Sequence, residues 1–126
     1  MTRNDAHETE AQSRWPDQYA VSQKRLGKLS AAQQRELFLA GEAITAELAQ
    51  AFLSGGALED DIVQEIVGRH YLWIDAFWTP SQAAYIGLGQ MYVSDERFAQ
   101  NYEKQAAGLA LFMSQAMAVW AKSNLS

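Results

Sequence analysis

The side chains best suited to recognising another molecule are aromatic, and they are concentrated in the second half of the chain. Fourteen of the 126 residues are aromatic. Tyrosine and tryptophan carry a polar atom that needs a hydrogen-bond partner when the ring is buried, so a small dry core accommodates few of them. A partly open cleft lined by such rings would suit a flat, heteroaromatic or macrocyclic ligand. Ten of the fourteen lie towards the C-terminus: Tyr71, Trp73, Phe77, Trp78, Tyr85, Tyr92, Phe98, Tyr102, Phe112 and Trp120.

An ordinary hydrophobic core is the alternative interpretation of the same rings. It is the favoured one for Phe77, Phe98 and Phe112, whose rings carry no polar atom. For the tyrosines and tryptophans, core and cleft remain equally open. The methionines near them fit both interpretations, because a flexible thioether fills irregular gaps. From the convergence of Trp, Tyr and Met on facing helix stripes we predict a cleft lined by His70, Trp73, Phe77, Tyr85, Met91, Tyr92, Phe98 and Tyr102.

His70 is one of two histidines, and isoleucines lie one helical turn away on either side of it. A nucleophilic enzyme needs a nucleophile, a base and an orienting group within reach of one another. A metal site needs several ligands at suitable spacing, and a single histidine is a weak basis for haem ligation. We therefore predict no enzymatic activity, no metal and no cofactor. His70 is either a hydrogen-bonded histidine at the edge of the core or a polar group in a ligand cleft.

Charge and cysteine content exclude other classes of function. The net charge is −5, whereas nucleic-acid binding draws much of its affinity from basic residues that neutralise phosphates; we expect no direct contact with nucleic acid. The absence of cysteine removes disulfides, thiolate metal sites and covalent capture of a ligand through a thiol. No apolar run is long enough to span a bilayer and no signal segment opens the chain, so we expect a cytoplasmic protein without a membrane partner.

Helical periodicity dominates the sequence and predicts an all-α fold of five or six helices. A short helix over residues 16–26 is expected, followed by a long one that opens with a capping box at Ser30 and Gln33. Gly41 falls in the middle of that helix, where glycine costs roughly 1 kcal/mol relative to alanine, and a close helix crossing would explain its presence.

Further helix starts are predicted at Asp60 or Asp61, at Thr79 followed by Pro80, and at residues 94–96. The helix that begins near Asp60 should carry a broad apolar stripe buried on two sides. At the predicted helix start over residues 94–96, Asp95 and Arg97 are expected to stabilise the helix end rather than to contact a ligand. The apolar stripe of the helix that begins near Asp60 comprises Ile62, Ile66, His70, Trp73 and Phe77, and Val63, Val67 and Ile74 widen it.

The stretch from Tyr85 to Phe98 resembles the TipAS antibiotic-recognition domain. This domain lies at the C-terminal end of some MerR-type transcription activators and also occurs alone or duplicated in drug-sequestering proteins. The similarity extends to Arg69–His70, to Tyr102 and to Gly108–Leu109–Ala110, and more loosely to Arg14–Trp15, Tyr19 and Ser22.

The resemblance implies a globin-like arrangement of helices, without haem, around a cleft for a hydrophobic antibiotic such as a thiopeptide. It also implies that residues 1–28 form an arm and short lid helix over a core of residues 29–126, with Trp15 and Tyr19 as lid residues that contact the ligand. In the activators a winged-helix domain contacts DNA. We therefore expect the effector-sensing module of a MerR-type regulator; the alternatives are a stand-alone drug-sequestering resistance protein and, less favoured, a helical protein-interaction module.

Overall fold

A computed structural model describes residues 16–126, with the backbone alone for residues 16–19. These residues form six α-helices and no strand, which confirms the predicted all-α fold. None of these helices combines the length and the apolar character that a membrane span requires. The helices are α2 (Pro16–Leu26), α3 (Ala31–Leu53), α4 (Asp61–Asp75), α5 (Gln82–Ser94), α6 (Glu96–Glu103) and α7 (Leu109–Asn124).

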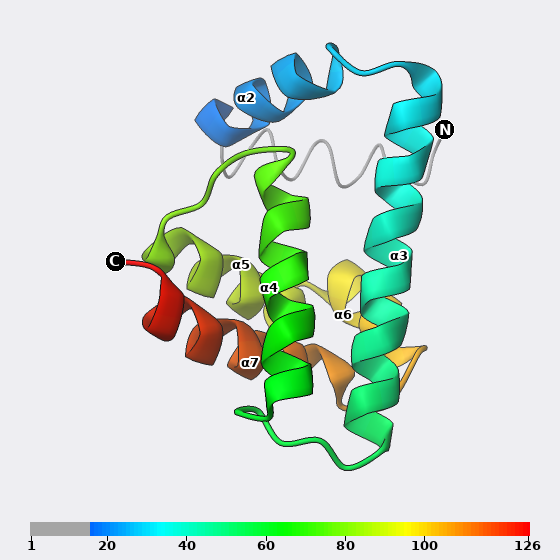
Figure 1. Cartoon of the computed structure of the whole chain (residues 1–126), viewed down its shortest axis with the longest axis vertical. Coiled ribbons are helices and arrows are strands. Elements are labelled where there is room, and N and C mark those ends of the chain that lie inside the picture. Colours follow the sequence, from blue (N-terminus) through cyan, green and yellow to red (C-terminus); the bar gives the residue numbers. More distant parts are fainter. Residues whose placement is uncertain (1–15) are drawn as a thin grey trace.

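Helices α3 and α4 form an antiparallel pair along the longest axis of the molecule (Figure 1). The predicted capping box begins α3: the Ser30 hydroxyl accepts from the Gln33 N–H at 3.1 Å, and the Gln33 side chain accepts from the Ser30 N–H at 2.9 Å. This reciprocal pair satisfies two of the N–H groups that have no partner within the helix. The start of the long helix is thus determined locally.

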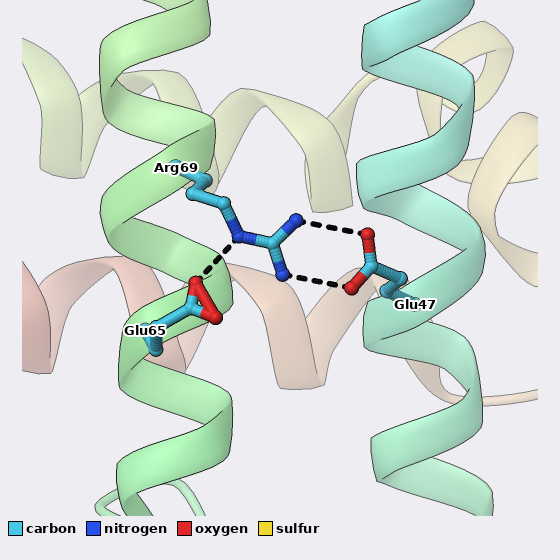
Figure 2. A network of polar contacts seen from close by, with 3 residues as sticks. All are labelled: Glu47, Glu65 and Arg69. Carbon is cyan, nitrogen blue, oxygen red and sulfur yellow. Dashed lines mark hydrogen bonds and ion pairs between the residues drawn. The ribbon is translucent and has the colours of Figure 1, made fainter.

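Arg69 connects the two helices at the surface (Figure 2). Its Nη1 and Nη2 donate to the two carboxylate oxygens of Glu47 at 2.9 and 2.8 Å, and its Nε donates to Glu65 one turn earlier on α4. The hydrogen bonds from Arg69 lower the pKa of Glu47 and raise the pKa of Arg69. Exposed ion pairs contribute little stability, but a bidentate guanidinium pair is geometrically specific, and here it links α3 to α4 at the surface.

Helices α5 and α7 lie side by side and cross α4 (Figure 1), and their mutual contact is the most extensive between any two helices described. Gly89 allows the close approach, because a Cβ there would lie 3.2 Å from Met117 Sδ and from the Ser114 Cα. Burial of an aliphatic or thioether side chain contributes roughly 1.5–3 kcal/mol. The fully buried large side chains are Leu48, Val63, Val67, Tyr85, Leu109, Met113 and Met117.

Helix α6 is short and contributes no fully buried residue. Asp95 caps it as predicted, with its Oδ1 accepting from the Arg97 N–H at 3.0 Å. At the other end, the Glu103 carboxylate accepts from the N–H groups of Gly108 and Ala110 at 2.9 and 3.0 Å, and these bonds lower its pKa. Helix α6 is therefore bonded at both ends, and the partly buried rings of Phe98 and Tyr102 pack against Tyr92 of α5.

Two local predictions, at Thr79 and at Ile62, were wrong in detail, whereas the helix start at Asp60 is confirmed with a different side-chain bond. Thr79 does not begin α5; Ser81 does, accepting from the Ala84 N–H at 3.2 Å, while the Thr79 hydroxyl donates to the Asp75 carboxylate. Asp60 precedes α4 as expected, but its side chain accepts from the Ala57 N–H in the preceding turn. Ile62 is 63% exposed, because the apolar stripe of α4 is wider than the surface its neighbours cover.

Candidate ligand-binding site

A cavity of about 740 Å³ opens among α3, α4, α6 and the C-terminal part of α5. Its size falls within the range of small-molecule sites. In Figure 1, α6 (yellow) is seen between α3 and α4, the two helices that supply the facing side of the cavity. The lining residues are Phe38, Gly41, Glu42, Thr45, His70, Trp73, Tyr92, Arg97, Phe98, Gln100, Asn101, Tyr102, Lys104 and Gln105.

Trp73 lies directly over the backbone of α3. A Cβ on Gly41 would be 2.4 Å from Cζ2 of the indole, a distance that atoms do not adopt. The indole Nε1 donates to the carbonyl of Leu37 at 2.7 Å, and the ring of Phe77 packs edge-on against Trp73 at 5.2 Å between centroids. The close helix crossing predicted from Gly41 is therefore a contact between backbone and ring, and it holds one aromatic wall of the cavity in place.

His70 lies at the base of the cavity and is 3% exposed. Its Nδ1 is 2.7 Å from the Tyr85 hydroxyl, which also lies 3.4 Å from the Val67 carbonyl. Within residues 16–126, His70 Nε2 has no hydrogen-bond partner. Burial lowers the pKa of His70 to about 3, because a charge is poorly solvated there. The side chain is therefore a neutral imidazole with one ring nitrogen bonded and the other buried without a partner among the described residues.

Three further rings form the opposite part of the lining. Tyr92 packs against Phe98 and Tyr102, with ring centroids 5.7 and 5.0 Å away. Burial raises the pKa of Tyr92 and of Tyr102, and a hydrogen bond joins the two side chains. Both phenols are neutral at ordinary pH, so this surface presents aromatic faces without charge.

Polar side chains lie along the α6 side of the cavity. Arg97 lines it while its guanidinium pairs with the Asp95 carboxylate at 3.1 Å, so the structural role expected for this pair coexists with a place at the cavity. Gln100, Asn101 and Lys104 continue this exposed surface. A ligand would thus meet rings on the α4 and α5 side and amide or charged groups on α6. Among the described residues no His, Cys, Asp and Glu side chains gather as a metal site would need.

The cavity brings together His70, Trp73, Tyr92, Phe98 and Tyr102 from the predicted set. Tyr85 and Met91 do not line it; they are 0% and 5% exposed within the core. Phe77 supports Trp73 from behind without lining the cavity. Trp15 and the side chain of Tyr19 lie outside the described part of the structure.

The α3 side of the cavity was missed at the sequence level. Phe38, Glu42 and Thr45 line it, and none of the three is among the predicted cleft residues. The signal that could have identified this side is Gly41, because residues one turn before and after a glycine at a helix crossing share its face. On α6, Phe98 and Tyr102 are four residues apart, and Asn101, three residues after Phe98, lies on the same side.

These features define an all-α domain with an open, aromatic-lined cavity between its helices. Residues 7–120 match the TipAS antibiotic-recognition domain. The chain belongs to this family, which confirms the resemblance found in the sequence.

Two kinds of relative accompany the family match. The HTH-type transcriptional regulator SkgA of Caulobacter vibrioides is 33% identical over 85 residues, which cover 66% of this chain and 33% of the regulator. The chain thus matches about a third of the length of its curated relatives. The TipAS protein of Streptomyces lividans, solved in complex with nosiheptide, superposes with a TM-score of 0.82 at 24% identity over 95% of this chain and 86% of that one. This likeness establishes the shared fold.

Proposed function

We propose that the domain binds a bulky hydrophobic antibiotic, of the thiopeptide class or similar, in the cavity between α3, α4 and α6. The observation that carries the proposal is the set of lining rings, Trp73, Tyr92, Phe98 and Tyr102, around about 740 Å³ of space. Stacking and apolar burial on such rings provide affinity, and the neutral state of the tyrosines suits an apolar ligand. The bound molecule is released unchanged, since the cavity offers no nucleophile with an adjacent base.

The same proposal assigns the domain to the effector-sensing part of a MerR-type transcription regulator in the cytoplasm. The match to part of an HTH-type regulator supports it. A ligand that binds one conformation better than another shifts the equilibrium between them, and an attached DNA-binding domain would respond to that shift. Contact with DNA is then made by that other domain, in keeping with the net charge of −5 here.

Nosiheptide, the ligand of the Streptomyces lividans protein, is the direct probe. We expect it to raise the melting temperature of this domain by several degrees, because a ligand at a hundredfold excess over its dissociation constant adds about 2.7 kcal/mol of stability. Intact-mass analysis after denaturation should show the unmodified chain, since no cysteine is present to form an adduct.

Trp73→Leu provides the control for the place of binding. It removes a cavity wall and the bond to Leu37, so the nosiheptide-induced shift should largely disappear. Leu72→Ala, one residue earlier and 67% exposed outside the cavity, should leave the shift unchanged. An undiminished shift in the Trp73 variant would place the ligand elsewhere, and no shift in the wild type would contradict the proposed ligand class.

We also propose that residues 1–28 act as a lid that closes on the ligand. Helix α2 takes no part in the more extensive helix contacts of the described chain, and its Val21 is 40% exposed. Its described attachments lie at one end: the Arg25 guanidinium donates to the Asp75 carbonyl and to Thr79, and Gln34 donates to the Leu26 carbonyl at 2.7 Å. A helix held at one end can move about that end.

Hydrogen exchange with and without nosiheptide tests the lid. We expect amides of residues 16–26 to be weakly protected in the free protein and strongly protected in the complex, since few packing contacts oppose local opening. Amides of α7, whose apolar face is buried, should be protected in both states and serve as the internal reference. High protection of α2 without ligand would show that it is a permanent part of the fold.

A further inference from the structure

The imidazole of His70 combines three features that no other polar group of the cavity has together. It is almost fully buried, it lines the cavity, and one of its nitrogens has no partner within residues 16–126. A buried polar group without a partner is unfavourable, because it has lost its hydrogen bonds to water without replacement. When such a group lines a binding cavity, a ligand that supplies the missing hydrogen-bond partner binds more tightly.

The proton on this imidazole can be placed from its neighbours. At 2.7 Å, either Tyr85 donates to His70 Nδ1 or the reverse. An imidazole nitrogen is the better acceptor and a phenol the better donor, and the other possible acceptor of Tyr85, the Val67 carbonyl, is 3.4 Å away. Tyr85 therefore donates to Nδ1, and the single imidazole proton resides on Nε2. Covalent ring geometry directs this Nε2–H away from Tyr85.

We propose that His70 Nε2–H selects, within the proposed ligand site, molecules that carry an in-plane hydrogen-bond acceptor on an aromatic ring system, such as a heteroaromatic nitrogen or a ring-conjugated carbonyl. Tyr85 is the positioning residue, because it fixes the tautomer without lining the cavity. The inference rests on the proposed function and adds the chemical feature by which ligands are distinguished.

The neighbouring rings give the geometry its selectivity. Trp73 and Tyr92 flank the imidazole, with centroids 5.8 and 6.1 Å away, so an acceptor reaching Nε2 belongs to a group that fits between aromatic faces. Because Nε2 exposes less than 1 Å², the proposal requires the cavity wall on α6, a helix with no fully buried residue, to move when the ligand enters. The donors of Asn101 on α6 and of Lys104, its C-cap residue, are exposed. A ligand that bonds to them only replaces a hydrogen bond to water, so these donors add little affinity.

Two fragments of equal shape isolate the acceptor. Quinoline and naphthalene differ by one ring nitrogen, and their affinities can be measured by NMR titration of the full chain. We expect quinoline to bind roughly five- to tenfold more tightly, the equivalent of one hydrogen bond to a buried donor. In a cavity without such a donor the order is reversed, because the nitrogen must lose its water without compensation.

Variants of the two residues test the assignment. His70→Phe should abolish the preference for quinoline or reverse it. Leu72→Ala, which alters an exposed side chain outside the cavity, should retain the preference. Tyr85→Phe, which keeps the imidazole, should weaken the preference and produce a mixture of tautomers, visible in the nitrogen chemical shifts of the ring. If His70→Phe does not fold, the Tyr85 variant and the wild-type nitrogen spectrum still test whether His70 Nε2–H is the selecting donor.

Several results would overturn the inference. They are equal affinities of the two fragments in the wild type, no binding of either, an unchanged preference in His70→Phe, or a spectrum with the proton on Nδ1. The outcome of the nosiheptide titration is independent of the fragment measurements. Nosiheptide binding without fragment selectivity would leave the proposed function intact and remove the role of His70, whereas fragment selectivity without nosiheptide binding would remove only the thiopeptide class.

Discussion

Gly41→Ala should lower both the stability of the domain and its affinity for a cavity ligand. The new Cβ would lie 2.4 Å from Trp73 Cζ2 and 2.7 Å from Cε2, so the indole must leave its place and lose its bond to the Leu37 carbonyl. Forcing a methyl group into a packed contact costs roughly 1–3 kcal/mol, against which the better helix propensity of alanine offsets about 1 kcal/mol. Because a wall of the cavity is displaced, nosiheptide affinity should fall roughly tenfold or more.

Gly87→Ala is the matched control. Gly87 also lies within a helix, but a Cβ there would meet nothing within 4 Å. Helix propensity alone then acts, and the variant should be more stable by about 0.5–1 kcal/mol with unchanged affinity. Urea unfolding and a nosiheptide titration of both variants measure the two effects. A Gly41 variant that behaves like the Gly87 variant would show that the Trp73 contact has no influence on the site.

His70 should make the domain sensitive to mild acid. Its pKa is lowered to about 3 in the folded state, against about 6.5 for a histidine in an unfolded chain. Below the unfolded value the unfolded state binds the proton and the folded state does not, so stability falls as pH falls. Between about pH 7 and about pH 5 this one group should remove about 2 kcal/mol from the free energy of unfolding.

Urea unfolding at the two pH values measures this loss. In His70→Phe the free energy of unfolding should hardly change between the two pH values. A variant of the other histidine, His7→Gln, should retain the loss of stability that His70 causes. Glu47 and Glu103, whose pKa values are also lowered, lose their contribution only below the ordinary carboxyl range and so do not obscure the interval. A wild-type profile as flat as that of the variant would mean that His70 is charged or solvated in the folded protein.

Local sequence signals determined much of the helical framework. The capping box at Ser30 and the Asp95 cap were predictable because they involve residues two or three positions apart. The predicted helix start at Thr79 was wrong because a residue far away in the sequence contacts this side chain. Its hydroxyl bonds to Asp75 and accepts from Arg25, fifty-four positions away, and a distant donor leaves no trace in the local pattern.

Composition indicated the aromatic rings from which a cleft could be built, but it could not distinguish the rings that line the cavity from the rings that fill the core. Tyr85 and Tyr92 belong to one helix and are both buried in it, yet only Tyr92 borders the cavity. The difference depends on which helix packs against each ring: Tyr85 faces Tyr71 and Trp120, and Tyr92 faces α6. Periodicity identifies a buried face but not what lies beyond it.

The sequence by itself therefore determined an all-α domain, its family and its abundance of aromatic rings, because helix periodicity, capping and composition are properties of the chain alone. Only the tertiary structure decided that α3 supplies one side of the cavity, that Gly41 accommodates Trp73, and that His70 has one nitrogen bonded to Tyr85 and the other without a described partner. These pairings join residues 15 to 36 positions apart, and their geometry arises when the helices pack and each side chain takes the space its neighbours leave.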